Sequence, residues 1–124
     1  MNKIKVGVVG TGFIGPAHIE ALRRLPNVEV AALCEVTIEL AEAKAKQLGI
    51  DRWYIFEDLL KQDDIQSVHI CTPNFLHYAQ SKAALLAGKH VICETFWMVM
   101  ALTGQTDSQR PQRMHWLWSI QRRL

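Results

Sequence analysis

The chain has 124 residues, the usual size of one domain. Its apolar fraction of 49%, charged fraction of 21% and formal net charge of +2 are ordinary for a globular protein and give no indication of nucleic-acid binding. The sequence shows neither a signal-peptide pattern nor an apolar run long enough to span a bilayer, so we expect a cytoplasmic protein without a membrane partner.

Strands and helices are predicted to alternate along the first 94 residues. Residues 4–9 are apolar on both faces, as in a central parallel strand, and a helix with Ile14, His18, Leu22 and Leu25 on one face follows. Further strands are predicted at residues 28–34, 53–56, 67–71 and 90–93, and further helices at residues 38–48, 57–62 and 75–87. This alternation predicts an α/β fold, a doubly wound parallel sheet with helices on both faces.

Residues 95–124 differ in character from residues 1–94. They contain three of the four tryptophans and no lysine, and their net charge is +3 (four Arg, one Asp) against −1 (ten Lys and Arg, eleven Asp and Glu) for residues 1–94. We therefore place a boundary at residue 94 and interpret the rest as an atypical tail. Two interpretations remain open, a divergent or disordered extension and an out-of-frame end. The apolar run at residues 96–102 would favour self-association if exposed.

A glycine motif connects the first predicted strand to the first predicted helix. In Gly10-Thr11-Gly12-Phe13-Ile14-Gly15, the first glycine permits a tight turn, the second lets the backbone approach a pyrophosphate, and the third lets helix and strand pack closely. The N–H groups near Phe13 and Ile14 would face the phosphates at the positive end of the helix dipole. The strand–turn–helix context favours a dinucleotide site of the Rossmann type.

Polar residues follow two other strands. Glu35 ends the second strand 20 residues after Gly15, where an acid accepts a hydrogen bond from a ribose 2′-hydroxyl; this predicts NAD, with NADP less favoured. The alternative for Glu35 is a solvated loop acid. Thr72 and Asn74 follow the fourth strand and are placed to donate to the ribose or the nicotinamide, although Asn74 could simply start the next helix. The alternative for His77 is a helix residue without cofactor contact.

The ordered set of motifs resembles a known family. The glycine motif, Thr72-Pro73-Asn74 followed by His77, the Ala-Gly-Lys-His-Val run at residues 87–91, and Glu94 together resemble the glucose–fructose oxidoreductase / inositol dehydrogenase / MocA family over residues 3–94. The resemblance implies an NAD(P)-dependent oxidoreductase of sugars, cyclitols or related polyols, with a C-terminal α+β substrate domain that this sequence lacks. The cofactor-binding residues it implies are Gly10, Gly12, Phe13, Ile14, Gly15, Glu35, Thr72, Asn74, His77 and Glu94.

One departure from the family pattern concerns catalysis. Members carry Glu-Lys-Pro at the final acid, the lysine serving at the active site, whereas Thr95 and Phe96 follow Glu94 here. We therefore expect no catalytic residue in this chain and a fragment inactive on its own. The alternatives are a non-catalytic NAD(H) sensor or interaction module whose tail docks a partner, and a fragment completed by a separate chain. The three cysteines, Cys34, Cys71 and Cys93, lie far apart and predict reduced thiols without a metal site.

Overall fold

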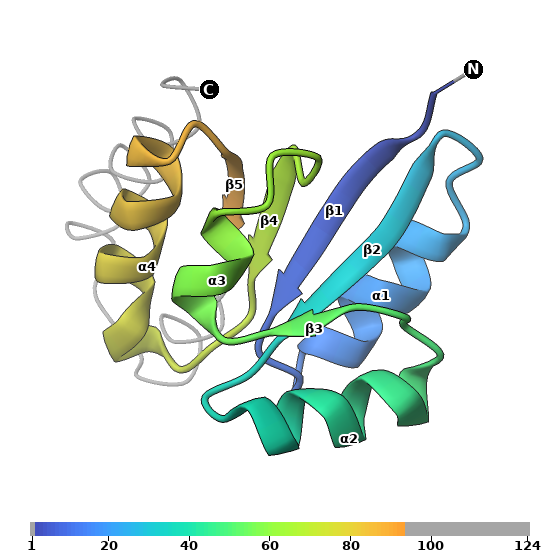
Figure 1. Cartoon of the computed structure of the whole chain (residues 1–124), viewed down its shortest axis with the longest axis horizontal. Coiled ribbons are helices and arrows are strands. Elements are labelled where there is room, and N and C mark those ends of the chain that lie inside the picture. The colour runs from blue at the N-terminus through green and yellow to red at the C-terminus, as the bar shows by residue number, and fades with distance from the viewer. Residues whose placement is uncertain (1, 94–124) are drawn as a thin grey trace, which may run out of the picture.

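The strands form one parallel sheet. In the computed structural model, which describes residues 2–93, the sheet contains β1 (Ile4–Val9), β2 (Val28–Cys34), β3 (Trp53–Tyr54), β4 (Ser67–Ile70) and β5 (His90–Cys93). Their order is β3-β2-β1-β4-β5, and every pair is parallel (Figure 1). The chain thus winds outward from β1 in one direction and then, from β4, in the other. This order places a topological switch point between β1 and β4.

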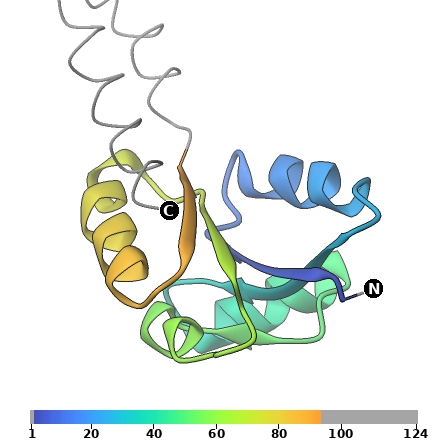
Figure 2. The same cartoon turned by 90° about the horizontal axis from the view of Figure 1, so that it is seen from above.

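The helices cover both faces of this sheet. They are α1 (Gly15–Arg23), α2 (Ile38–Leu48), α3 (Phe56–Leu60) and α4 (Asn74–Leu86). Viewed from above, α1 and α4 flank the sheet on opposite sides (Figure 2). No helix within residues 2–93 combines the length and the apolar character that crossing a bilayer requires.

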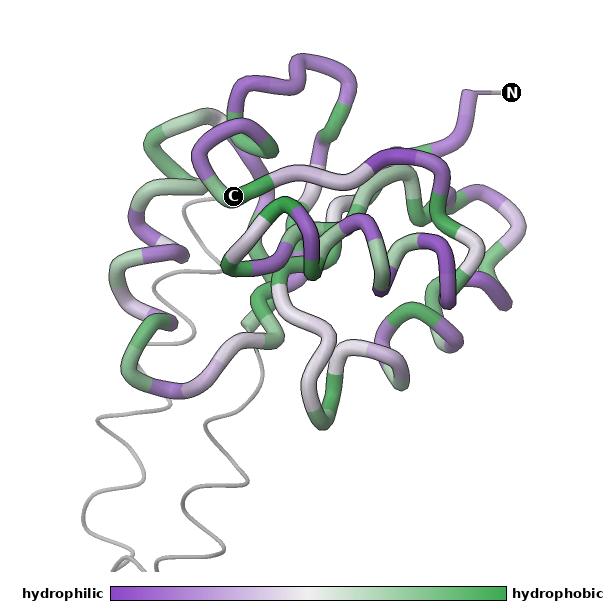
Figure 3. The backbone as a smooth tube through the Cα atoms, turned by 60° about the horizontal axis from the view of Figure 1, so that its bottom comes forward, coloured by the Kyte–Doolittle hydropathy of each residue, from purple (hydrophilic) through white to green (hydrophobic). Residues whose placement is uncertain are grey.

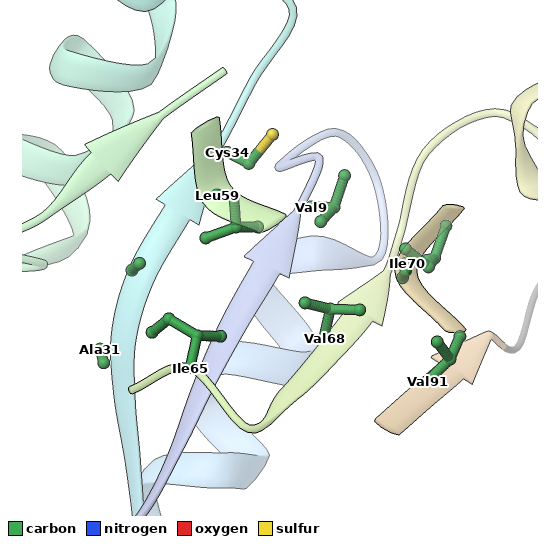
Figure 4. Close-up of a cluster of buried hydrophobic side chains, with 10 residues drawn as sticks. Val9, Ala31, Cys34, Leu59, Ile65, Val68, Ile70 and Val91 are labelled. Atoms are coloured by element: carbon green, nitrogen blue, oxygen red, sulfur yellow. The ribbon is translucent and has the colours of Figure 1, made fainter. Parts of the chain in front are cut away.

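Two apolar clusters fill the spaces between the sheet and its helices. One joins α1 and α2 to the sheet, with Val8, Ile19 and Ala41 almost fully buried. The other joins α3 and α4 to the opposite face and includes Leu59 and Val68 (Figure 4). Hydrophobic stretches accordingly run through the centre of the molecule (Figure 3). The carboxyl-terminal halves of β1 and β2 and most of β4 are buried on both faces, so these stretches are largely apolar and do not alternate. The edge strand β5 instead alternates between exposed and buried residues along residues 90–92.

The ends of α2 follow the predicted local chemistry. The Thr37 hydroxyl accepts a hydrogen bond from the Leu40 N–H at 3.2 Å, which caps the N-terminus. Gly49 ends the helix in the left-handed region at φ 69°, and its N–H donates to the carbonyls of Ala45 and Lys46. The Thr37 cap fixes the start of α2 after β2, beside the carboxyl edge of the sheet, and Gly49 ends α2 before β3.

Three details differ from the sequence prediction. Leu25 does not belong to the buried face of α1; it is 48% exposed, because the helix ends at Arg23, and Ile19 is buried instead. Ile38 is apolar and begins the helix predicted at residues 38–48, yet it is 44% exposed. The third strand has two residues instead of four, because Ile55 already caps α3. The predicted tail, residues 95–124, lies outside the described residues.

Candidate functional site

Two adjoining cavities open at the carboxyl edge of the sheet. The larger, of about 590 Å³, lies at the switch point between β1 and β4, and the smaller, of about 470 Å³, lies toward α3 and α4. We call the first the groove and the second the side pocket. The groove is lined by residues 10–14, 35–36, 40, 44, 71–73 and 75–76, and it shares Gly10, Glu35, Val36, Thr72 and Leu76 with the side pocket. Open α/β sheets bind their ligands in this position.

The three glycines of the loop between β1 and α1 meet different requirements. Gly10 has φ 88°, and a Cβ there would lie 2.9 Å from Thr72 Cγ2. A Cβ on Gly15 would overlap the carbonyl oxygen of Gly10. A Cβ on Gly12 would meet no atom within 4 Å, so packing within the chain does not require glycine there. Gly12 instead leaves the floor of the groove open to whatever approaches the loop.

The backbone of the same loop offers donors to an anion. Within residues 2–93, the N–H groups of Gly12, Phe13 and Ile14 have no hydrogen-bond acceptor. Ile14 is the N-cap of α1 and makes no side-chain cap, and Pro16 follows in the first turn. Unpaired amides at the positive end of a helix dipole favour a phosphate. The loop thus presents three unpaired amides at the start of α1.

Glu35 points back toward this loop. Its Oε1 accepts a hydrogen bond from the Thr11 N–H at 2.7 Å and another from the Thr11 hydroxyl. Its own N–H donates to the Tyr54 carbonyl at 3.3 Å, which holds the end of β2 against β3. The carboxylate is half-buried and lines both cavities. The sequence predicted Glu35 at the cofactor, but it did not single out Thr11 as its partner.

Thr72 and His77 form the other wall. Thr72 is 9% exposed and donates its hydroxyl to Gln80 Oε1 at 2.5 Å. His77 is 7% exposed, and its Nε2 lies 2.5 Å from the Thr72 carbonyl oxygen. Burial lowers the pKa of His77, while the Thr72 carbonyl acts in the opposite direction. The neutral imidazole therefore donates to Thr72 and fixes the loop after β4, and His77 itself lines neither cavity.

Asn74 and Glu94 differ from the other candidates. Asn74 is exposed and is the first residue of α4; the N-cap is Pro73, without a side-chain cap. Asn74 lines neither the groove nor the side pocket; it starts α4, as the alternative prediction has it, but its side chain forms no cap. Glu94 and Thr95 lie outside the described residues.

Several lining residues escaped the sequence analysis. Leu40 and Lys44 lie four residues apart on α2, a spacing that puts them on one face, and both border the groove. Lys44 brings a cation to a groove that also holds Glu35. Phe75 also lines the groove and is 82% exposed, as does Phe13, which was already a candidate and is 84% exposed. The i, i+4 spacing of Leu40 and Lys44 is a signal readable in the sequence, but nothing in the sequence tells which face of α2 meets the groove.

Cys34 borders the side pocket as an inert thiol. It is 2% exposed, and burial, followed by the nearby charges of Glu35 and Glu57, raises its pKa to about 12. A thiol with such a pKa is protonated at neutral pH and is therefore a poor nucleophile. Within the described range, no three His, Cys, Asp or Glu side chains are grouped so that they could hold a metal ion.

The cavities fit the parts of a dinucleotide. Unpaired amides suit a pyrophosphate, a carboxylate suits a ribose hydroxyl, and the predominantly apolar side pocket, with Ile55 and Leu76 in its wall, suits a flat ring.

Comparison with known proteins agrees with this geometry. Residues 4–95, about three quarters of the chain, match the model of the glucose–fructose oxidoreductase / inositol dehydrogenase / MocA family, described as an oxidoreductase family with an NAD-binding Rossmann fold. The chain belongs to this family. It carries the family's NAD-binding domain, which confirms the predicted fold and cofactor.

Individual relatives show the same extent of similarity. An inositol 2-dehydrogenase/D-chiro-inositol 3-dehydrogenase of Lactiplantibacillus plantarum is 36% identical over 93 residues, covering 73% of this chain and 27% of the relative. A levoglucosan dehydrogenase of Pseudarthrobacter phenanthrenivorans is 35% identical over 117 residues, covering 85% and 28%. A solved levoglucosan dehydrogenase, in complex with NADH and L-sorbose, superimposes with a TM-score of 0.70 at 33% identity, covering 75% and 27%. The chain thus spans about a quarter of the length of these relatives.

Proposed function

We propose that this domain binds NAD(H) in preference to NADP(H), with the adenosine ribose at Glu35 and the pyrophosphate at the amides of Gly12, Phe13 and Ile14. The observation that carries the proposal is the position of the Glu35 carboxylate, which Thr11 holds beside those unpaired amides. A carboxylate accepts a hydrogen bond from a ribose 2′-hydroxyl but repels a 2′-phosphate.

The residues of the chain bind and orient; the hydride chemistry is supplied by the nicotinamide when the cofactor is bound. The loop amides hold the phosphates, and the Thr72 loop, supported by His77, forms the opposite wall. Ile14 and Leu76 line the groove with apolar surface and exclude water from it. On the family resemblance we assign Asn74, although it lines neither cavity, and Glu94 to the nicotinamide; His77 supports Thr72.

We further propose that the whole protein oxidises a sugar, cyclitol or related polyol, and that this 124-residue chain does not turn over such a substrate by itself. The relatives named above are inositol and levoglucosan dehydrogenases. Thr95 replaces the lysine that the family pattern places beside the nicotinamide, and a threonine cannot supply that cation.

Calorimetric titration of the full chain with NADH and with NADPH tests the binding proposal. We expect NADH to bind at least about tenfold more tightly, since like charge at a partly desolvated site is worth one or more pKa units of interaction. Glu35→Gln, which keeps the size of the side chain but removes its charge, should bring the two affinities together. Equal affinities in the unmodified chain would contradict the assignment of Glu35 to the ribose.

Steady-state assays with NAD and a panel of polyols test the second proposal. We expect no NADH production above background. Turnover that survives repurification and is lost in a Gly12→Val variant would contradict it.

A further inference from the structure

Thr11 lies between the first two glycines, lines the groove and does not have a positive φ. It is nevertheless only 4% exposed, although its hydroxyl is polar. Both of its donors, the backbone N–H and the side-chain hydroxyl, reach the same atom, Oε1 of Glu35, from 24 residues away in the sequence. The hydroxyl of Thr11 thus donates its hydrogen bond to Glu35, the residue that we assign to the ribose.

These two hydrogen bonds occupy one oxygen of the Glu35 carboxylate and leave the other oxygen available. A carboxylate oxygen accepts about two hydrogen bonds in its lone-pair directions, and Oε1 already has both. Within residues 2–93, all hydrogen bonds of the Glu35 side chain go to Oε1. Oε2 therefore remains as the acceptor for a ligand, and its direction is set by Thr11. A glutamate at a strand end would otherwise sample several rotamers.

We propose that Thr11 is a positioning residue that determines cofactor specificity: it holds Glu35 where its charge meets the 2′ position of the adenosine ribose. This inference rests on the proposed NAD(H) site and deepens it. Discrimination against NADP(H) then depends on Thr11, the second residue of the glycine loop, as well as on Glu35. Lys44 lines the same groove, so a 2′-phosphate finds a cation there once the carboxylate is released.

Removing the hydroxyl of Thr11 should relax the specificity. In Thr11→Val, the shape is kept and one of the two donors is lost. We expect the ratio of NADPH to NADH dissociation constants to fall about tenfold, within the range of a hydrogen bond to a charged group. Thr11→Ser keeps the hydroxyl and should restore the ratio to within about twofold of the parent, a difference too small to indicate a lost charged hydrogen bond. Thr11→Ala also lacks the hydroxyl and serves if Thr11→Val fails to fold.

A double-mutant cycle shows whether Thr11 acts through Glu35. In a Glu35→Gln background, Thr11→Val should leave the ratio unchanged, because there is no charge left to position. Thr37→Val is the matched control. Its hydroxyl caps α2 through Leu40 and lines neither cavity, so it should lower the melting temperature without altering the ratio.

The possible outcomes separate this inference from the proposal on which it rests. A chain that binds NADH tightly and keeps its preference in both Thr11→Val and Thr11→Ala overturns the role of Thr11 and leaves the NAD(H) site standing. The role of Thr11 is also overturned if Thr11→Val changes the ratio of NADPH to NADH dissociation constants equally in the parent chain and in the Glu35→Gln background. A chain that shows no preference before any substitution overturns both.

Discussion

The carbonyl oxygen of Gly10 occupies the position that a Cβ on Gly15 would need. This contact joins the end of β1 to the first residue of α1, so the loop between them can close only if residue 15 is glycine. Gly10 is constrained in turn, by φ 88° and by Thr72 Cγ2 at 2.9 Å from its hypothetical Cβ. The loop is therefore shaped by contacts within the chain at both ends and is open in the middle, at Gly12.

The first prediction concerns stability. Gly15→Ala should lower the free energy of unfolding by about 2 kcal/mol or more, because the methyl group meets backbone that cannot move without shifting β1 or α1. Urea unfolding measures the loss. Gly12→Ala is the matched control, since its methyl group enters open space. Similar losses in the two variants would show that the contact between residues 10 and 15 is not what constrains the loop.

Gly12→Val, unlike Gly15→Ala, should affect cofactor binding and not stability. We expect a fold of nearly unchanged stability and an affinity for NADH lowered at least about tenfold, because the isopropyl group fills the approach to amides that donate to a charged phosphate. Fluorescence titration with NADH measures the affinity, and circular dichroism checks the fold. Unchanged affinity would mean that the pyrophosphate lies elsewhere.

Much of this site follows from the sequence, for physical reasons. The glycine spacing, the apolar strand before it and the acid after the second strand are local signals, and the structure brings Gly10, Gly12 and Glu35 together as expected. The partnership of Thr11 with Glu35 was not predictable, because it depends on side-chain directions across two strand ends. Asn74 was expected to reach the cofactor or to start the next helix; it is the first residue of α4, and Pro73 takes the N-cap position without a side-chain cap.

His77 should make stability depend on pH. Burial lowers its pKa in the folded state, so the unfolded chain, with a histidine pKa of about 6.5, binds the proton more readily. Stability should therefore be complete above about pH 6.5 and decline as the pH falls below that value. His77→Gln, whose amide can still donate to the Thr72 carbonyl, should lose less stability between pH 7 and pH 5 than the parent chain does.

Denaturant unfolding at several pH values measures this difference. His90→Gln, at an exposed position on β5, is the control for the general effect of removing a histidine. Parallel pH profiles for the parent and His77→Gln would contradict a buried neutral imidazole at position 77.

Lys44 should contribute electrostatically to cofactor binding. Lys44→Gln removes a cation from the groove but keeps most of the length of the side chain. We expect the affinity for NADH to fall about threefold to tenfold at low salt and the difference to shrink at high salt, because screening weakens exposed charge interactions. Lys82→Gln on α4, exposed and outside both cavities, is the control. A difference that is independent of salt would indicate a packing role for Lys44.

Lys89 belongs to the Ala-Gly-Lys-His-Val run on which the family resemblance partly rests, and its position explains why a lysine stands there. It is 7% exposed, and its ammonium donates to the Gln62 carbonyl at 2.5 Å and to the Ile65 carbonyl at 2.7 Å. These bonds tie the start of β5 to the segment between α3 and β4, at the amino edge of the sheet, opposite the groove.

Lys89→Met keeps the length of the side chain and removes the charged donor, so the buried Ile65 carbonyl and the part-buried Gln62 carbonyl lose the ammonium, although the Gln62 carbonyl still accepts from the Ile65 N–H at 3.3 Å. The free energy of unfolding should fall by about 2–3 kcal/mol, as for hydrogen bonds to a charged group, whereas Lys82→Met at an exposed position should change it by less than about 0.5 kcal/mol. The dissociation constant for NADH should stay the same wherever Lys89→Met remains folded, because the groove lies at the other edge. A loss of NADH affinity at full folding would show that Lys89 acts on the cofactor site, and a stability equal to that of Lys82→Met would show that the two carbonyls are satisfied without it.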